Sequence, residues 1–290
     1  MCNEGLLGSR RARRAGAIFA GVVLLATSAT GCDWPARTRY VHPVFASDNG
    51  TTNIVYRTTT TYTGAAIDLK LDIYQPVGDT ATERPVMMWM HGGYWIGGSK
   101  ENMTAYAKDS ATRGYVGVTI QYRLRNSIAD FSAAALDAYD DSVAAAQWLE
   151  AHAAQYRIDP DAIIAAGYSA GAVNAMNLVF LPPDRGPATS PVDGGVSISG
   201  LSFAAPRAHR AKIIMFHGTN DPLVPYASGE GVCQQTRAAG NGCEFVPYQG
   251  AGHEIGGTQV ADIQARTHDY IFEQILLPLG YKAVQLPAGT

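Results

Sequence analysis

The sequence predicts an α/β protein with a mainly parallel β-sheet and helices on both of its faces. Three observations lead to this fold class: a hairpin-like segment comes first, short strand-like segments then alternate with helical ones, and these later strands are mostly continuously apolar or β-branched. Strands that are buried on both faces show such continuous apolar runs. With 290 residues, 47% hydrophobic and 16% charged, the chain can form one domain with a sizeable core.

The first two predicted strands form an antiparallel hairpin. Residues Ile54–Thr61 are rich in β-forming side chains, and Thr63-Gly64 provides a turn. Residues Ile67–Ile73 then alternate apolar and polar side chains with a period of two. We therefore expect one face of this hairpin to contact the core and the other to face water.

Six further predicted strands are short and mostly apolar or β-branched. They are Pro85–Met90, Tyr115–Gln121, Ala162–Ala166, Gly195–Ser199, Lys212–Phe216 and Glu244–Tyr248. Residues Phe131–Ala154 show the clearest helical pattern, because apolar side chains recur there every three or four positions. Connection rules then predict an eight-stranded, mostly parallel sheet. The connection between the sixth and seventh strands is too short for a helical lid, so we expect an open site.

The N-terminus resembles an export signal. A cluster of arginines between residues 10 and 14 precedes the apolar run Ala15–Ala26, which is too short to span a bilayer. We expect residues 1–31 to be a signal peptide, 32–52 a tether and 53–290 the catalytic domain. Residues Ala29-Thr30-Gly31-Cys32 are similar to a lipoprotein cleavage box, with alanine where leucine is commonest, which predicts lipidation of Cys32. The alternative is an ordinary cleavage site that leaves Cys32 a free thiol.

Charge and cysteine content agree with an exported protein. Cleavage before Cys32 would move the net charge from −3 to −6, and an acidic domain argues against nucleic acid as a partner. Cys2 leaves with the signal peptide, and if Cys32 carries lipid, Cys233 and Cys243 remain as a pair that an oxidising compartment could join in a disulfide. The alternative is two unpaired thiols, without the companions that a zinc site needs.

The strongest local motif is Gly167-Tyr168-Ser169-Ala170-Gly171. It follows a predicted apolar strand and precedes the helix-like Ala172–Leu178, which is the context of a nucleophile elbow. Glycines on both sides permit a sharp turn, and the N-terminus of the following helix favours developing negative charge. The motif therefore predicts Ser169 as a nucleophile.

A serine nucleophile needs an imidazole to accept its proton and a carboxylate to orient that imidazole. Asp221 follows the predicted seventh strand and His253 follows the eighth, at the strand ends where α/β sheets place their sites. The chain order Ser169, Asp221, His253 is the order of α/β-hydrolases. The competitors are weaker because of their positions in predicted elements; they are His91, His152, His209, His217, His268, Asp193 and Glu254.

Acyl transfer also needs N–H donors for the developing oxyanion. The segment His91-Gly92-Gly93-Tyr94-Trp95 follows the predicted third strand, and its glycines allow the backbone to approach a substrate closely. We expect an oxyanion hole formed by the N–H groups of Gly93, Tyr94 and Ala170. His91 and Trp95 are expected to hold this loop in place.

These motifs, together with Tyr122-Arg123-Leu124, resemble the hormone-sensitive-lipase-like and the feruloyl- and acetyl-esterase-like branches of the α/β-hydrolase superfamily. The resemblance covers residues 53–281 and implies ester hydrolysis without a metal or cofactor. Hormone-sensitive-lipase relatives usually have a third glycine where this chain has Tyr94, and they carry an N-terminal cap for which residues 33–52 are too short. Esterases for short acyl groups or polysaccharide substituents share the tyrosine form, as do arylformamidases.

The sequence thus predicts a carboxylic ester hydrolase for small or exposed acyl groups, with a small-molecule or polysaccharide-linked ester as substrate. Two alternatives stay open: an amide hydrolase of the arylformamidase or peptidase type, and a surface binding protein without catalysis. Thioesterase and transacylase activities also stay open. We expect the pocket walls to come from the loops Pro182–Asp193 and Leu201–Arg210.

Overall fold

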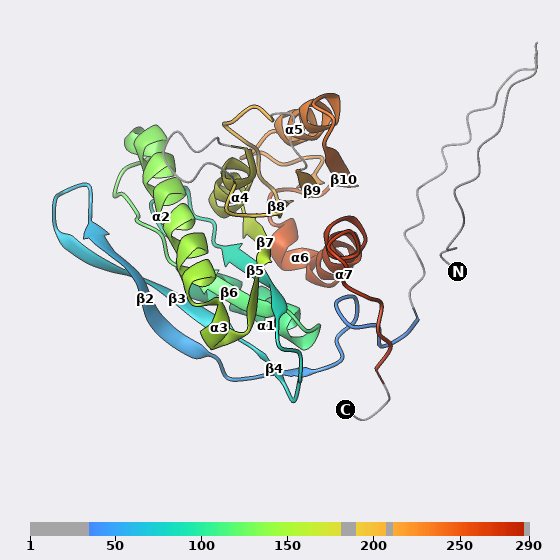
Figure 1. Ribbon diagram of the computed structural model, residues 1–290. Helices are drawn as coiled ribbons and strands as arrows, with labels where there is room; N and C mark the ends of the chain where they lie inside the picture. The colour runs from blue at the N-terminus through green and yellow to red at the C-terminus, as the bar shows by residue number, and fades with distance from the viewer. Residues whose placement is uncertain (1–34, 181–189, 207–210, 287–290) are drawn as a thin grey trace, which may run out of the picture.

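The computed structural model describes residues 35–180, 190–206 and 211–286. It contains an eight-stranded sheet with the order β10-β9-β8-β7-β5-β6-β3-β2 (Figure 1). The strands are β2 (Thr51–Thr60), β3 (Ala66–Tyr74), β5 (Arg84–Met90), β6 (Val116–Ile120), β7 (Ile158–Tyr168), β8 (Gly194–Ile198), β9 (Lys212–Gly218) and β10 (Gly242–Tyr248). All pairs are parallel except β2 with β3 and β3 with β6. The predicted α/β-hydrolase architecture is confirmed.

Helices cover both faces of this sheet (Figure 1). On one face lie α2 (Phe131–Ala151), α4 (Ala170–Phe180) and α5 (Tyr226–Ala238), and on the other lie α1 (Thr104–Thr112) and α7 (Val260–Ile271). Shorter helical segments are η1 (Lys100–Met103), η2 (Ile128–Asp130), α3 (Ala153–Tyr156), α6 (Ile255–Thr258) and η4 (Phe272–Leu276). Two hydrophobic cores result, one on each side of the sheet.

Strand β5 explains why the central strands are apolar throughout. All seven of its residues are buried. Met88 and Met90 point into the core beneath α2 and α4, whereas Met87 and Trp89 point into the core beneath α1 and α7. A strand between two cores has mostly apolar side chains on both faces, so the period-two alternation disappears. The charged residue of β5, Arg84 at its start, is buried in an ion pair with Asp79.

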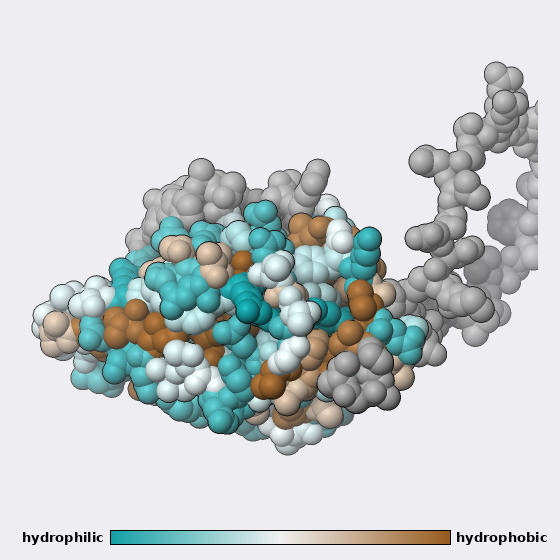
Figure 2. Space-filling view, turned by 60° about the horizontal axis from the view of Figure 1, so that its bottom comes forward, coloured by the Kyte–Doolittle hydropathy of each residue, from teal (hydrophilic) through white to brown (hydrophobic). Residues whose placement is uncertain are grey.

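Strand β2 forms the edge of the sheet and pairs only with β3 among the described strands. Its ladder with β3 contains two register shifts, between Thr51 and Ile54 and between Val55 and Arg57. Such irregularities twist an edge strand and discourage pairing with another chain. Figure 2 shows a band of hydrophobic residues on the side that this hairpin occupies, and Val55 on β2 is exposed.

Residues 35–52 were expected to be a tether, but the structure contradicts this. Tyr40 and Val41 are buried, with 5% and 2% of their surface exposed, and Tyr40 packs edge-on against the ring of Tyr115. Strand β1 (Ala46–Ser47) pairs with β4 (Pro76–Val77). The segment is mostly irregular backbone, so its buried side chains recur with no fixed spacing. Its burial could therefore not be predicted from the sequence. The folded domain begins before Asn53, whereas the signal peptide and Cys32 lie outside the described residues.

Two other expectations concern helices. The helix predicted over residues 131–154 ends at Ala151 as α2, and a separate short helix, α3, follows. The described part of the connection between β8 and β9, residues 199–206, contains no helix, and residues 207–210 lie outside the description. No helix of the described residues combines the length and the apolar composition needed to span a membrane.

Candidate active site

Ser169 lies at a sharp turn between β7 and α4. Its φ angle of 54° is unusual for a residue with a side chain, and its N–H donates a hydrogen bond to the carbonyl of Ile198 at 2.9 Å. A side chain at Gly167 would overlap the backbone of Gly171, and one at Gly171 would overlap the backbone of Met90 and His91. Both glycines are therefore required by close backbone approach, as a nucleophile elbow demands.

The structure brings the three predicted side chains into hydrogen-bond contact. Ser169 Oγ lies 2.9 Å from His253 Nε2, and His253 Nδ1 lies 2.8 Å from Asp221 Oδ2. All three residues are buried, with 6–8% of their surface exposed. Because a carboxylate can only accept, Asp221 fixes the proton of His253 on Nδ1 and leaves Nε2 free to accept the proton of Ser169.

Asp221 is held by donors from its own loop. Its Oδ1 atom accepts the backbone N–H groups of Leu223 and Val224, both at 2.9 Å. This leaves Oδ2 directed at His253. The turn that follows Asp221 thereby orients the carboxylate.

His217 also contacts Asp221, a role that sequence reasoning missed. Its Nε2 atom lies 2.9 Å from the carbonyl of Val224 and 3.3 Å from Asp221 Oδ2. Since the Val224 carbonyl can only accept, Nε2 carries a proton that also faces the carboxylate. Burial lowers the pKa of His217, which keeps the ring neutral. The position of His217 four residues before Asp221, at the end of β9, was the available signal.

The loop that carries His253 is held by two hydroxyl groups. Ser199 Oγ donates to the carbonyl of His253 at 2.8 Å, and Tyr168 Oη approaches the same carbonyl at 3.4 Å. Tyr168 belongs to the elbow itself, so the nucleophile and the base are tied to each other through the backbone. This contact places the imidazole without using its ring nitrogens.

The competing residues lie elsewhere or serve other contacts. The Nδ1 atom of His152 lies 2.8 Å from the carbonyl of Trp148 on α2, and that of His268 lies 2.8 Å from the carbonyl of Gln264 on α7. Asp193 accepts the N–H of Ile163 at 3.0 Å. Glu254 is described below, and His209 lies outside the described residues.

The predicted oxyanion loop lies directly beside the elbow. Gly92 is so close to Ser169 Cβ that a methyl group on it would lie 3.0 Å away. Gly93, Tyr94 and Trp95 all have positive φ angles, of 121°, 55° and 58°. Within the described residues the N–H groups of Gly93 and Tyr94 donate to no protein acceptor, and that of Ala170 is free at the start of α4. These three donors are available to an oxyanion.

His91 and Trp95 anchor this loop, as expected. The buried ring of His91 stacks on Tyr122 at 4.2 Å, and its Nδ1 lies 2.8 Å from the carbonyl of Gly92. Burial lowers the pKa of His91 to about 4, so the ring is neutral. Trp95 Nε1 donates to Asn174 Oδ1 on α4 at 2.8 Å. The loop is thus fixed to both the sheet and the helix behind the elbow.

An apolar cavity of about 350 Å³ opens beside Ser169. Its lining is almost entirely hydrophobic and consists of Tyr94, Trp95, Ile128, Phe131, Ser169, Ala170, Val173, Leu201, Phe203, Leu223 and Val224. Leu201 and Phe203 come from a loop that was predicted to form a pocket wall. The other predicted wall, Pro182–Asp193, lies mostly outside the described residues, and the described cavity does not use its remainder.

A second, more polar cavity of about 250 Å³ also borders the elbow. It is lined by Gly92, Asn102, Met103, Tyr106, Tyr168, Glu254, Gly256 and Gly257. Gly92 contacts Ser169 Cβ, Tyr168 precedes the nucleophile, and Glu254 follows His253. Of these two cavities, the apolar one is lined by Ser169 itself, and the polar one by residues adjacent to Ser169 and His253.

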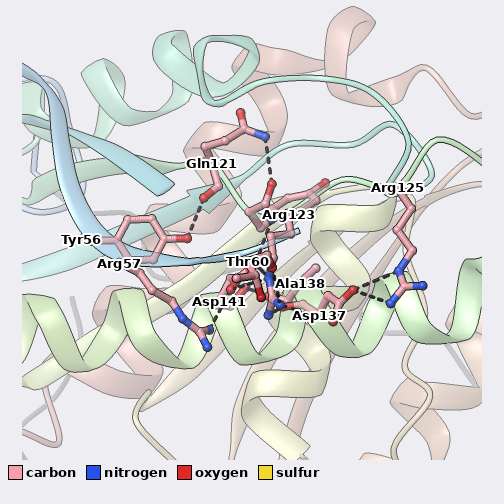
Figure 3. A network of polar contacts seen from close by, with 11 residues as sticks. Tyr56, Arg57, Thr60, Gln121, Arg123, Arg125, Asp137, Ala138 and Asp141 are labelled. Carbon is pink, nitrogen blue, oxygen red and sulfur yellow. Dashed lines mark hydrogen bonds and ion pairs between the residues drawn. The ribbon is translucent and has the colours of Figure 1, made fainter. Parts of the chain in front are cut away.

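An ion-pair network supports one wall of the apolar cavity (Figure 3). Asp141 on α2 is fully buried, and it accepts hydrogen bonds from Arg57 on β2 at 2.7 Å and from the Arg123 side chain at 2.9 Å. Arg125 donates to Asp137 on the same helix at 2.7 Å, and its backbone N–H bonds the carbonyl of Trp95. The network connects the edge hairpin, the segment after β6 and the oxyanion loop.

The predicted cysteine pair forms a disulfide that joins α5 to β10. Cys233 and Cys243 have their Cα atoms 5.5 Å apart. The bond lies away from Ser169 and fixes the helix that follows the Asp221 loop. Cys32 is outside the described residues.

The fold and the contacts of Ser169, His253 and Asp221 together define an α/β-hydrolase with a serine-hydrolase arrangement. A model of the phospholipase/carboxylesterase family matches residues 126–271, half of the chain, and the protein belongs to this family. A BD-FAE family model also matches residues 71–179.

Relatives of the chain include curated enzymes and solved structures. The medium-chain fatty acyl-CoA hydrolase precursor of Anas platyrhynchos is 37% identical over 123 residues, covering 41% of this chain and 22% of the relative. Carboxylesterase 1C of Rattus norvegicus is 38% identical over 119 residues, covering 39% and 22%. The match thus spans about a fifth of the length of these curated relatives. The propionate-bound structure of a Thermogutta terrifontis esterase superposes with a TM-score of 0.66 at 25% identity, covering 82% of this chain and 97% of that one.

Proposed function

We propose that this protein hydrolyses carboxylic esters through an acyl-enzyme. Ser169 Oγ attacks the ester carbonyl while His253 Nε2 accepts its proton, and His253 then gives that proton to the departing alcohol. A water molecule, deprotonated by His253 in the same way, releases the acid from Ser169. The observation that carries this proposal is the pair of hydrogen bonds at 2.9 and 2.8 Å that joins Ser169, His253 and Asp221.

The N–H groups of Gly93, Tyr94 and Ala170 stabilise the negative charge of the tetrahedral intermediate. Such donors act most strongly where water is excluded, and the loss of one typically lowers the rate about a hundredfold. Tyr94 and Trp95 adopt positive φ angles in this loop. The strain of these residues supports a functional role, because strained backbone is usually kept where geometry matters.

The proposed substrates carry small or exposed acyl groups. The apolar cavity beside Ser169 has a volume of about 350 Å³ and hydrophobic walls, which suits a short acyl chain. The solved structures of the Thermogutta terrifontis esterase with bound propionate and butyrate support this size class. The proposal includes acyl groups linked to a polysaccharide, because the apolar cavity reaches the protein surface at the exposed Phe203 and Leu223.

The test of the proposed function is the variant Ser169→Ala. We expect its kcat/KM on p-nitrophenyl acetate to fall by at least about a thousandfold, because the nucleophile is lost. Wild type should also be labelled by a fluorophosphonate probe at Ser169, with the site identified by mass spectrometry. The control is Ser228→Ala on α5, away from the described cavities, which should keep both properties. Unchanged esterase activity in Ser169→Ala would refute the mechanism.

The amide-hydrolase alternative uses the same residues on a different leaving group. Wild-type rates on an aryl acetate and on the matching formamide separate the two functions. The proposal requires a higher kcat/KM for the ester, since an amine is the poorer leaving group and needs a more demanding protonation by His253.

We propose also that the chain is exported and held at a membrane by a lipid on Cys32. The support is the sequence pattern that ends in Ala29-Thr30-Gly31-Cys32, together with the disulfide of Cys233 and Cys243, which suits an oxidising compartment. The mature protein should enter the detergent phase in a phase-partition experiment, and Cys32→Ser should stay in the aqueous phase. Recovery of both forms in the aqueous phase would refute lipidation.

A further inference from the structure

The second cavity, of about 250 Å³, borders the residues next to Ser169 and His253, because its lining includes Tyr168 and Glu254. His253 Nε2 has to give its proton to the oxygen of the leaving group, so the alcohol lies on the His253 side of the reacting carbonyl. This cavity is formed by the residues after His253, namely Glu254, Gly256 and Gly257, and by Tyr168 of the elbow. The apolar cavity is left for the acyl group.

We propose that this cavity is the alcohol subsite and that Glu254 and Asn102 select alcohols carrying additional hydroxyl groups. The proposal rests on the proposed ester hydrolysis and specifies its leaving group. The bond that breaks is the one between the acyl carbon and the alcohol oxygen, and the alcohol leaves with the proton that His253 took from Ser169. The additional hydroxyl groups stay intact and only bind.

Glu254 supplies the acceptor of this subsite. Its Oε2 atom accepts the hydroxyl of Tyr168 at 2.9 Å, which orients the carboxylate along the cavity wall. In the part of the chain that the structure describes, no lysine, arginine or histidine lies within ion-pair distance of Glu254. The Oε1 atom is therefore open to a ligand that donates a hydrogen bond.

Asn102, which also lines this cavity, supplies the donor. Its Oδ1 atom accepts the backbone N–H of Ser99 at 2.8 Å, and this bond directs the Nδ2 end of the amide away from Ser99. The Nδ2 group makes no hydrogen bond to another described residue. It carries two N–H donors at the lining of the cavity.

A hydroxyl group matches this lining better than an ionic group does. A hydroxyl can donate to Glu254 and accept from Asn102, whereas a quaternary ammonium can accept nothing and would meet the amide donors unfavourably. An anionic alcohol would be repelled by Glu254 and by the nearby Asp221. The rings of Tyr106 and Tyr168 provide flat apolar surface for the carbon atoms of a polyol.

The two cavities differ enough in polarity that each suits a different end of an ester. The acyl cavity places hydrophobic side chains around Ser169, so a polar acyl chain would lose its hydration there without compensation. The alcohol cavity offers a carboxylate and an amide in addition to two rings. An ester with a short apolar acid and a hydroxylated alcohol satisfies both.

The experiment compares two acetates that have the same number of alcohol carbons. Glyceryl 1-monoacetate carries two free hydroxyl groups, and n-propyl acetate carries none. Acid release in a pH-stat gives kcat/KM for each, and the ratio of the two values is the readout. The variants are Glu254→Gln, which keeps shape and one acceptor, Glu254→Leu, which keeps only volume, and Asn102→Asp, which keeps the acceptor for Ser99.

We expect wild type to favour the monoacetate and Glu254→Leu to lower the ratio by about tenfold, which is the effect of one hydrogen bond to a charged group. Glu254→Gln and Asn102→Asp should lower the ratio less. The control Glu83→Gln removes the same charge at the opposite end of the sheet, where Glu83 precedes β5, and should leave the ratio unchanged.

Three outcomes would overturn the assignment or its basis. An unchanged ratio in Glu254→Leu contradicts the subsite. A preference for acetylcholine over its neutral isostere 3,3-dimethylbutyl acetate that disappears in Glu254→Gln, with an unchanged monoacetate ratio, assigns the cavity to cations instead. Wild type that cleaves neither acetate contradicts the proposed ester hydrolysis itself.

Discussion

At the residue scale, the chemistry depends on few side chains with unambiguous protonation. Asp221 receives hydrogen bonds from two backbone N–H groups and from His253, and His217 Nε2 lies 3.3 Å from its Oδ2 atom. Among the described residues, no lysine or arginine forms an ion pair with it. His91 and His217 are kept neutral by burial, which lowers the pKa of each. Among the described histidines, only His253 contacts both a serine hydroxyl and a carboxylate, which is the arrangement that the proposed proton transfer requires.

Sequence motifs were sufficient to predict that Ser169, His253 and Asp221 meet, because each follows the end of a predicted strand. The same reasoning could not find His217 as a support for Asp221. Whether His217 supports Asp221 depends on which atoms its ring faces. Its Nε2 atom reaches the Val224 carbonyl and Asp221 only after β9 and the loop that follows it have folded. Lone histidines give no such information in sequence.

His268 leads to a prediction for the pH dependence of stability. It is fully buried on α7, and burial together with the charge of Arg113 lowers its pKa to about 3. The unfolded chain takes up a proton on this histidine near pH 6.5, and the folded protein does not. The stabilisation is thus complete above pH 6.5 and is lost progressively as the pH falls from 6.5 towards 3.

We expect His268 alone to account for a loss of about 2 kcal/mol in the free energy of unfolding between pH 8 and pH 5. In His268→Asn, which can still donate to the Gln264 carbonyl, this part of the pH dependence should disappear. Urea unfolding at both pH values measures it. Equal losses in wild type and variant would show that His268 is not responsible.

At the element scale, α2 acts as a support for the active-site loops. Asp137 and Asp141 on this helix hold Arg123 and Arg125, and the backbone of Arg125 bonds Trp95 in the oxyanion loop (Figure 3). The sequence showed the apolar stripe of α2 and not this polar side. Charged residues on a helix usually face water, so only the packing of β2 and the segment after β6 could reveal that Asp141 is fully buried.

Asp141→Asn tests this support. The change leaves the guanidinium groups of Arg57 and Arg123 without their buried counter-charge, and we expect the free energy of unfolding to fall by about 3 kcal/mol. KM for an ester should rise as well, because Ile128 on η2 and Phe131 at the start of α2 line the apolar cavity. Urea unfolding and steady-state kinetics measure the two effects.

The matched control is Asp140→Asn. Asp140 is the preceding residue on α2, and within the described chain it makes no ion pair. Its variant should unfold within about 0.5 kcal/mol of wild type, as is usual for surface substitutions. A similar loss in both variants would assign the effect to the helix charge in general and not to the Asp141 contacts.

At the scale of the whole molecule, the order and type of the main elements followed from the sequence. All eight strands of the large sheet were predicted within a few residues, because continuous apolar runs and turn residues separate them clearly. The packing of residues 35–52 could not be predicted. It depends on single aromatic contacts such as Tyr40 with Tyr115, which lie 75 positions apart and leave no periodic pattern.

These N-terminal residues join the domain at one end of the sheet. Arg39 pairs with Asp79, which also binds Arg84 at the beginning of β5, and Tyr40 bonds the backbone of Arg113, just before β6. Ser169 lies at the other end, where β7 stops. A seven-residue strand such as β5 is roughly 23 Å long, so the entry of the chain and the nucleophile are separated by about that distance.

This separation determines which way the active site faces relative to Cys32. Three residue steps connect Cys32 to Pro35 and reach about 11 Å at most when extended. If a lipid holds Cys32 in a bilayer, the catalytic mouth opens towards the aqueous compartment, on the far side of the domain from its own anchor. The enzyme would then act on soluble esters or on esters in a polymer layer that faces the membrane. The lipids of the leaflet that holds Cys32 would be too far from Ser169 to react.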